Sequence, residues 1–409
     1  MNRPYLENPM DEFPIPTRVE PRVPMSSPDL TDAEREAVAA VLRTPSLSIG
    51  PRIEAFEASV AEYTGAAHAI AVSSGTAGLH LCVVAAGVGE GDLVITTPFS
   101  FVASANVILY QQALPVFVDV DPATGNIDAS LAAEAAAALA LRRGDAARWL
   151  PRTGVSAGGS LKAILPVHVF GQPADLDPLL ETARTHGLAL IEDACEALGA
   201  AYRGRRAGTM GDTGVFAFYP NKQITTGEGG MVITEDREAA DMIRALRNQG
   251  RAPGDSWLQH TYLGYNYRMD EMSAALGAAQ MDRLDELIDK RIRVANWYVE
   301  RLAGIQGVEP YTISPSTTRM SWFVFVVRLD PEIPRERVAR ALMSQGIPVR
   351  PYFLPIHLQQ YMVDRFGYRV GDFPVTEDLG RRSLALPFSG VMEEAQVDLV
   401  CHALGEALK

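Results

Sequence analysis

Lys222 is the residue of this sequence with the clearest potential for chemistry. It lies in a turn rich in Gly and Thr, between the apolar runs 215–219 and 231–234. The aromatic neighbours Phe218 and Tyr219 favour a partly desolvated amine, and desolvation favours the neutral, nucleophilic form that condenses with a carbonyl to give a Schiff base. An exposed lysine in a surface loop is the ordinary alternative. Two further segments decide between these interpretations.

The second segment is Ser74-Gly-Thr-Ala-Gly78, which follows the apolar run 69–72 and precedes a helical pattern that starts at Leu79. Unpaired N–H groups and the helix dipole attract anions at the start of a helix, and small residues let a phosphate approach the backbone. The segment has neither the GK[ST] ending of a P-loop nor a GxGxxG spacing. By itself it indicates an anion site and nothing more specific.

The third segment, Ile191-Glu-Asp-Ala-Cys-Glu196, places Asp193 at the carboxyl end of a predicted buried strand. No cluster of histidines accompanies this acid, so we expect no metal site. Pyridoxal 5'-phosphate (PLP) requires a lysine for its aldehyde, an anion site for its phosphate and an acid that keeps the pyridinium nitrogen protonated. The sequence contains all three, which predicts PLP as the cofactor.

The elements that must position these residues follow an α/β pattern. We expect a first helix over 31–43, opened by a capping box at Thr31. A second helix should end at Gly65, and a third should span 176–186. Continuously apolar runs are typical of strands covered on both faces, which predicts a large, mostly parallel mixed sheet flanked by helices. These runs lie at 69–72, 93–97, 115–119, 163–167, 188–192, 215–218 and 231–234.

A chain of 409 residues exceeds one compact core, so we expect two domains. The predicted parts are an extended arm over 1–27, a large α/β domain over 28–270, and a smaller α+β domain over 271–409 that begins with a long linking helix, 270–302. Residues 141–160 look like an exposed loop rich in Gly, Arg and Ser, and we assign them no chemistry.

Composition excludes several classes of function. A net charge of −13 argues against a nucleic-acid partner. The three cysteines lie far apart and form no CxxC pair, which indicates neither a zinc site nor a disulfide framework and favours a reducing compartment. Because no signal peptide and no run of about 20 apolar residues is present, we expect a cytoplasmic protein without a membrane partner.

The sequence resembles the PLP-dependent nucleotide-sugar aminotransferases of the DegT/StrS family over about residues 25–408. This resemblance implies the fold type I aminotransferase architecture and a homodimer in which both chains contribute to each active site. The matching segments are 74–77, 97–104, 166–173, 192–197, 219–230, 264–269 and 354–358.

The resemblance implies a role for each matching residue. Lys222 would bind the cofactor aldehyde covalently, and Asp193 would pair with the pyridinium nitrogen. Thr76 and Ala77, beside Gly75, would hold the phosphate through their backbone N–H groups.

Four further positions follow from the same resemblance. Phe101 would stack on the pyridine ring, and Asn266 would reach the phosphate in the neighbouring subunit. Glu196 stands near the phenolic oxygen, where many members have Gln or His and perosamine-synthase-like members have Glu. Ala217 departs from the family, because many members have a phosphate-binding serine there, and we expect weaker PLP binding unless a water or Ser73 substitutes for the lost hydroxyl.

The implied activity is the transfer of an amino group, with glutamate as the expected donor, to a keto carbon of a nucleotide-linked sugar in polysaccharide or secondary-metabolite biosynthesis. An aminocyclitol ketone is an alternative acceptor. A PLP-binding regulatory protein without turnover is an alternative of another class, but the N-terminal arm is too short and too weakly basic for a DNA-binding module. His168 and His357 fit either packed histidines or substrate contacts, so we leave them outside the catalytic set.

Overall fold

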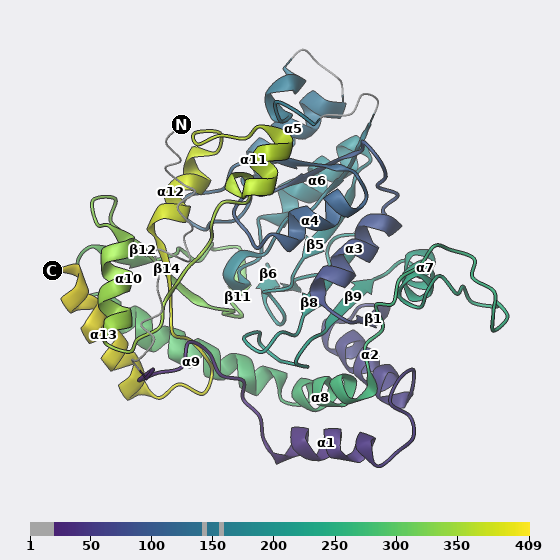
Figure 1. Ribbon diagram of the computed structural model, residues 1–409, viewed down its shortest axis with the longest axis horizontal. Helices are drawn as coiled ribbons and strands as arrows, with labels where there is room; N and C mark the ends of the chain where they lie inside the picture. The colour runs from purple at the N-terminus through teal and green to yellow at the C-terminus, as the bar shows by residue number, and fades with distance from the viewer. Residues whose placement is uncertain (1–19, 141–144, 155–158) are drawn as a thin grey trace.

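The central feature of the computed structural model, which describes residues 20–140, 145–154 and 159–409, is a seven-stranded sheet (Figure 1). Only β9 runs against its neighbours, and the other six strands are parallel to one another. This confirms the predicted mostly parallel mixed sheet. The strand order is β1 (His68–Val72), β9 (Gly230–Thr234), β8 (Thr213–Ala217), β5 (Ala189–Asp193), β4 (Leu161–Ile164), β2 (Leu93–Thr96) and β3 (Leu114–Phe117).

Both faces of this sheet are covered, because successive side chains of a strand point to opposite faces. Val215 of β8 packs in one core with α3 and α7, whereas the adjacent Phe216 packs in another with α2 and α8. The helices of this region are α1 (Asp32–Leu42), α2 (Pro51–Thr64), α3 (Gly75–Ala85), α4 (Ala103–Tyr110), α5 (Ala129–Ala140), α6 (Leu176–His186), α7 (Arg237–Arg247) and α8 (Glu271–Met281), with short 3-10 turns at Ala146–Trp149 and Val169–Gly171.

The expected helix ends are confirmed. Thr31 and Glu34 form the predicted capping box at the start of α1. Gly65 and Gly187 end α2 and α6 in the left-handed conformation, with φ of 81° and 64°. The described residues leave out 1–19, 141–144 and 155–158, and with them most of the predicted N-terminal arm and parts of the 141–160 loop.

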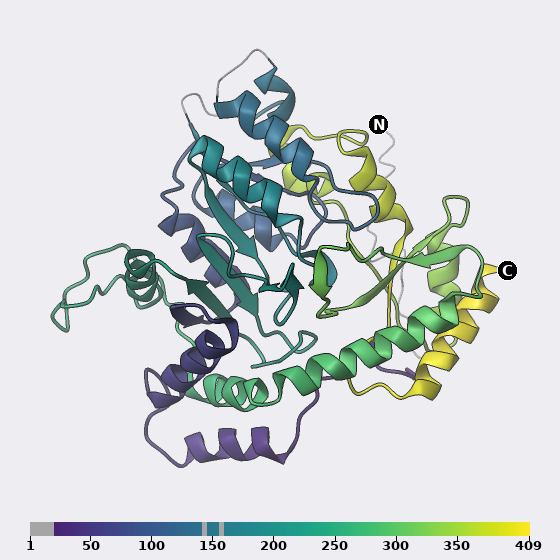
Figure 2. The same cartoon turned by 180° about the vertical axis from the view of Figure 1, so that it is seen from behind.

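A second, antiparallel sheet forms in the C-terminal part, with the order β10 (Val308–Pro310), β12 (Phe325–Leu329), β14 (Ser383–Leu386) and β13 (Arg350–Pro351). It shares a core with α9 (Leu284–Leu302), α10 (Arg335–Ser344) and α13 (Glu394–Leu408), and Val23 from the N-terminal segment is buried in that core. Figure 2 shows α9 running along the molecule from the large sheet to this smaller one. The remaining elements are β6 (Ala201–Tyr202), β7 (Arg205–Arg206), β11 (Thr317–Arg319), a 3-10 turn at Ile356–Leu358, α11 (Gln360–Phe366) and α12 (Pro374–Arg382).

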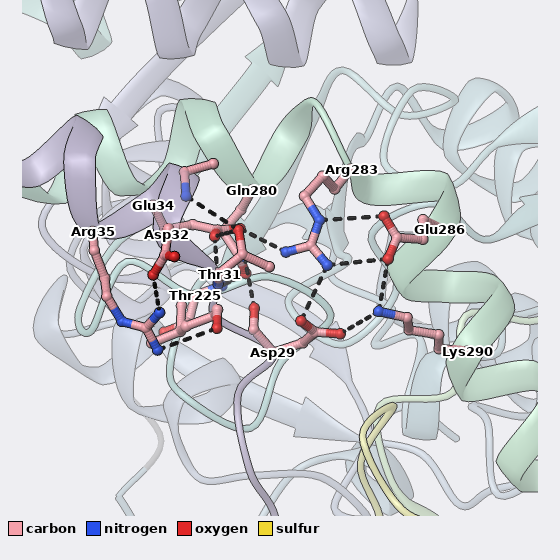
Figure 3. A network of polar contacts seen from close by, with 12 residues as sticks. Asp29, Thr31, Asp32, Glu34, Arg35, Thr225, Gln280, Arg283, Glu286 and Lys290 are labelled. Atoms are coloured by element: carbon pink, nitrogen blue, oxygen red, sulfur yellow. Dashed lines mark hydrogen bonds and ion pairs between the residues drawn. The ribbon is translucent and has the colours of Figure 1, made fainter.

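The predicted long helix over 270–302 is two helices. α8 ends at Met281 and α9 begins at Leu284, with Asp282 and Arg283 between them. The break lets Arg283 turn toward the N-terminal segment, where its guanidinium contacts Asp29 and Glu34 (Figure 3). Both partners lie about 250 residues away in the sequence, so helical periodicity could not reveal the interruption. None of the described helices is both long and apolar enough to cross a bilayer.

Candidate active site

A cavity of about 720 Å³ opens where β5 and β8 end and α3 begins. Its wall includes Gly75, Thr76, Phe101, Asp193, Glu196 and Lys222, which the sequence predicted as site residues. The C-terminal part contributes Phe323, Arg350, Tyr352 and Phe353. The cavity therefore lies between the two sheets, as expected for a ligand site at the carboxyl ends of parallel strands.

The Lys222 amine points at a carboxylate and an aromatic face. Its Nζ lies 3.7 Å from Oε1 of Glu196 and 3.6 Å from the centroid of the Phe323 ring, and 12% of the side chain is exposed. The turn is closed by a 2.9 Å hydrogen bond from the Lys222 N–H to the Tyr219 carbonyl. Lys222 is therefore a largely buried amine with the Glu196 carboxylate beside it as a proton acceptor. This is the environment of a reactive lysine.

Asp193 is buried and held by three donors. Its Oδ2 accepts from the Ser104 hydroxyl at 2.6 Å, its Oδ1 accepts from the Cys195 N–H at 3.2 Å, and its carbonyl accepts from the His168 N–H at 3.0 Å. Ser104 lies in the first turn of α4, far from Asp193 in the sequence. The sequence therefore did not indicate the hydrogen bond between Ser104 and Asp193. The carboxylate is fixed in orientation and faces the cavity, as required of an acid that pairs with one ring nitrogen.

Glu196 is a buried carboxyl beside the lysine. Its Oε2 accepts the Phe170 N–H at 2.8 Å, and Phe170 takes a left-handed φ of 62°, which is uncommon for an aromatic residue. Burial raises the pKa of Glu196, and the nearby Lys222 ammonium opposes this rise only in part. The raised pKa makes Glu196 a better proton acceptor than an exposed glutamate.

The start of α3 forms a narrow cradle of small residues. A Cβ on Gly75 would stand 2.7 Å from the Ala217 Cβ and 2.8 Å from the Cys195 Sγ, so only glycine fits. The N–H of Ala77 donates to the Ser74 hydroxyl at 3.0 Å, while the N–H groups at the first positions of a helix have no acceptor within the helix. Anions bind at such ends.

Asn221 adds an orphaned polar atom to the same wall, because its Oδ1 is buried and has no hydrogen-bond partner among the described residues. Together with the cradle, the enclosed lysine and the oriented carboxylate, this donor and acceptor set fits PLP. Ser74 lines the cavity beside Ala217, whereas the N–H of Ser73 donates to the Tyr267 carbonyl. Ser74 therefore shares the cavity wall with Ala217, whereas Ser73 does not line the cavity.

Phe101 and Asn266 lie apart from the buried groups. Phe101 lines the cavity with 63% of its surface exposed, so its ring is free to cover a planar ligand. Asn266 is exposed and does not line the cavity of its own chain. It follows a loop after α7 that extends away from the body of the molecule (Figures 1 and 2).

His168 and His357 are packed histidines with buried acidic partners. Nε2 of His168 lies 2.9 Å from Glu192, and its Nδ1 accepts the Ala174 N–H at 3.1 Å. Nε2 of His357 lies 3.0 Å from Glu377. Neither ring lines the cavity, so leaving both outside the catalytic set agrees with the structure. Within the described ranges no group of three or more His, Cys, Asp or Glu is arranged to hold a metal ion.

Comparisons with known proteins identify the family of this chain. Residues 28–405 match the DegT/DnrJ/EryC1/StrS aminotransferase family. The chain is 40% identical over 393 residues to the GDP-perosamine synthase of Caulobacter vibrioides, covering 95% of this chain and 99% of that one. It is 35% identical to the spore coat polysaccharide biosynthesis protein SpsC of Bacillus subtilis, covering 95% and 97%.

Solved structures show the same architecture. DesV of S. venezuelae, solved in complex with a ketimine intermediate, superposes with a TM-score of 0.83 at 32% identity, covering 95% of this chain and 99% of that one. A 3-amino-5-hydroxybenzoic acid synthase gives a TM-score of 0.83 at 29% identity, covering 95% and 99%. The chain belongs to the DegT/DnrJ/EryC1/StrS family of aminotransferases. It is a PLP-dependent enzyme with the fold type I architecture expected from the sequence.

Proposed function

We propose that this enzyme moves an amino group from an amino acid, with glutamate as the expected donor, to a keto carbon of a nucleotide-linked sugar. The observation that carries the proposal is that Lys222, Asp193 and the first turn of α3 open into one cavity. The relative named GDP-perosamine synthase supports a sugar acceptor. The cavity volume, within the range of small-molecule sites, is consistent with a ligand of that class beside a cofactor.

In this proposal each part of PLP has a partner in the chain. Lys222 binds the aldehyde, Asp193 faces the ring nitrogen, and the N–H groups of Gly75 and Thr76 hold the phosphate. Phe101 covers the ring. The N–H of Ala77 also binds the phosphate when it no longer donates to the Ser74 hydroxyl. Bound PLP supplies an electron sink that stabilises negative charge on the donor carbon.

The chain's own groups orient the reaction and move its proton. Once its amine is free, Lys222 carries a proton at Nζ, and Glu196 stands 3.7 Å away as the group that can accept and return it. Ser104 fixes the Asp193 carboxylate through the 2.6 Å hydrogen bond. Phe323 and Tyr352 form an apolar wall that limits water at the amine.

Both proposed substrates carry negative charge, and Arg350 is a cation of the cavity wall that can receive it. Its Nη1 donates to the neighbouring Val349 carbonyl, and no carboxylate in the described chain lies within ion-pair distance. With a neutral aminocyclitol ketone as the acceptor, only the glutamate donor would use this cation. Glutamate with a panel of nucleotide-linked keto sugars and cyclitol ketones distinguishes the acceptors, because only the correct class gives amination at micromolar substrate.

The active unit in this proposal is a homodimer that works in the cytoplasm. Trp257, Leu258 and Leu263, in the loop that precedes Asn266, expose 77%, 83% and 90% of their surface. Apolar side chains this exposed are typical of a surface that another chain covers. Three free cysteines support a reducing compartment.

The test of the proposed lysine uses borohydride reduction of the PLP-loaded protein and peptide mass mapping. The chain has four lysines, Lys162, Lys222, Lys290 and Lys409, and we expect a pyridoxyl adduct at Lys222 alone. Lys222→Ala should abolish transamination and leave the fold intact, while Lys162→Ala serves as the matched control. An adduct at another lysine, or full turnover by Lys222→Ala, contradicts the assignment.

A further inference from the structure

Arg291 is a buried cation on α9 that binds the backbone of the Lys222 turn. Only 4% of the residue is exposed. Its Nη2 donates to the carbonyls of Asn221, at 3.2 Å, and Lys222. Its Nη1 donates to the carbonyls of Trp322, at 3.1 Å, and Phe323, at 3.2 Å.

No carboxylate among the described residues lies within 4 Å of this guanidinium, so four carbonyl dipoles take the place of an ion-pair partner. Burial lowers the pKa of Arg291 to about 10, which still leaves it charged at neutral pH. A buried charge is costly, and apolar side chains of similar volume often stabilise a core at least as well. The arrangement is therefore better explained by the geometry that it imposes than by stability.

The four carbonyls belong to two loops, which a 2.9 Å hydrogen bond from Gln223 Nε2 to the Ser321 hydroxyl also joins. One loop carries Lys222, and the other carries Phe323, whose ring centroid lies 3.6 Å from the Lys222 Nζ. The residue before Phe323, Trp322, takes a left-handed φ of 52°. Such a conformation in a bulky residue persists when its surroundings hold it, and the Arg291 bond to the Trp322 carbonyl is one such restraint.

We infer that Arg291 is a positioning residue that sets where the Lys222 amine stands relative to Phe323 and Glu196, by clamping the main chain of both loops on one guanidinium. The planar fork is essential to this role, because lysine has a single point charge and cannot bind four carbonyls in two loops. The inference rests on the proposed role of Lys222. It adds that Arg291, a residue of α9 outside the cavity, determines the position of the Lys222 amine.

The test compares two forms of the cofactor. Pyridoxal phosphate needs the lysine to bind covalently, whereas pyridoxamine phosphate lacks the aldehyde and binds through its ring and phosphate alone. In Arg291→Met we expect the apparent affinity for pyridoxal phosphate to fall about tenfold, the usual effect of losing a hydrogen bond to a charged group. The affinity for pyridoxamine phosphate should stay at the wild-type value. Both are measured by spectral or fluorescence titration of the apoenzyme.

Arg328→Met is the matched control, because Arg328 is also a buried arginine of the C-terminal part but contacts Pro122 and Glu309. It should change neither affinity, whatever it does to the melting temperature. Arg291→Lys keeps the charge and most of the side chain. If Arg291→Met does not fold, this variant provides the test of cofactor affinity. It should show the same selective loss for the aldehyde form.

Two results would overturn the inference: equal losses of both cofactor forms in the Arg291 variants, which indicate general damage, or no loss of either form. Peptide mapping of the reduced wild-type protein separates this outcome from failure of the proposed function. An adduct away from Lys222 refutes the role of the lysine, whereas an adduct at Lys222 with unselective affinities refutes only the role of Arg291.

Discussion

At the scale of single residues, the phosphate cradle shows how closely this site is fitted. Ala217 lies where its Cβ excludes any side chain on Gly75, and Ser74 is the hydroxyl residue of the same wall. Ala217 itself carries no hydroxyl. In the proposed site, residue 217 therefore donates no hydrogen bond to the phosphate.

Restoring this hydroxyl gives the first prediction. Ala217→Ser should tighten PLP binding by up to about tenfold, because a hydrogen bond to a charged group is worth ~1.4 kcal/mol or more. Turnover at saturating PLP should change little, since the phosphate does not react and the added bond acts equally in ground and transition states. Spectral titration of the apoenzyme and saturated turnover are the two measurements.

The alternative outcomes are informative. Unchanged affinity means that Ser74 or a water already fills the position. Weaker affinity means that the added oxygen is forced against Cys195 or the first turn of α3, and it contradicts the proposed place of the phosphate. Ala217→Gly, which removes the Cβ without adding a hydroxyl, is the control for altered packing.

The sequence was sufficient for residues that lie in short local motifs. Lys222, Asp193 and Glu196 each follow a strand in a recognisable segment, and all three line the cavity. Ser104 and Arg291 were missed, because their partners are distant in the sequence and a hydrogen bond between distant segments leaves no local pattern. Phe323 was also missed, although it packs on the Lys222 amine.

At the scale of elements, α1 is attached to the end of α8 and the start of α9 by a buried polar network (Figure 3). Oε1 of Glu34 accepts from Gln280 at 2.6 Å and from Arg283 at 2.9 Å. Oε1 of Gln280 in turn accepts the Thr225 N–H at 3.3 Å, three residues beyond Lys222. Gln280 of α8 thus joins the N-terminal helix to the lysine turn, and Arg283 in the interruption adds a second contact to the N-terminal helix.

This network predicts an acid-dependent loss of stability. Burial raises the pKa of Glu34, but hydrogen bonds from Thr31 and Gln280 outweigh it and lower the pKa from 4.5 to about 2. A carboxyl with a depressed folded-state pKa contributes stability above its unfolded-state pKa, and this contribution is lost as pH falls from 4.5 toward 2. Linkage limits the contribution to about 3 kcal/mol.

We therefore expect Glu34→Gln to be less stable than the wild type at pH 7, and the difference to shrink steadily below pH 4.5. Urea unfolding at a series of pH values measures it. Glu36→Gln, an exposed glutamate of the same helix, is the matched control and should show no such difference. A difference between Glu34→Gln and wild type that is constant with pH would show that the carboxyl is not the responsible group.

At the scale of the whole molecule, the placement of Asn266 outside its own cavity leads to a test of the proposed dimer. If Asn266 completes the site of the partner, then Asn266→Ala and Lys222→Ala chains, each weakly active or inactive alone, should regain activity when mixed. In a mixed dimer one of the two sites is intact, so mixed dimers should have about half the wild-type activity per dimer.

The control is a mixture of Lys222→Ala with a second Lys222 variant, which has no intact site in any pairing. Sedimentation at micromolar concentration establishes the state of each mixture. A fully active monomer, or no complementation in a sample shown to contain mixed dimers, contradicts the shared site.

The fold class and most element bounds followed from periodicity and caps, because those signals are local. Local signals did not predict that β9 runs antiparallel to its neighbours, or that α8 and α9 are separate helices. Both depend on contacts between distant segments: β9 pairs with β1, and Arg283 binds Asp29. Such contacts are properties of the assembled chain.

The attachment of the N-terminal segment to the C-terminal sheet also bears on how the protein is made. Val23 is buried in a core whose other members lie between Val294 and Ala407, and the Met25 carbonyl accepts the Phe388 N–H at 2.9 Å. The ribosome synthesises Val23 and Met25 long before Phe388. During most of synthesis the N-terminal segment therefore lacks the C-terminal residues that it contacts in the folded protein. Long-range pairing of this kind slows folding and leaves apolar residues uncovered meanwhile. A prematurely terminated chain would therefore also leave its N-terminal segment without its native partner.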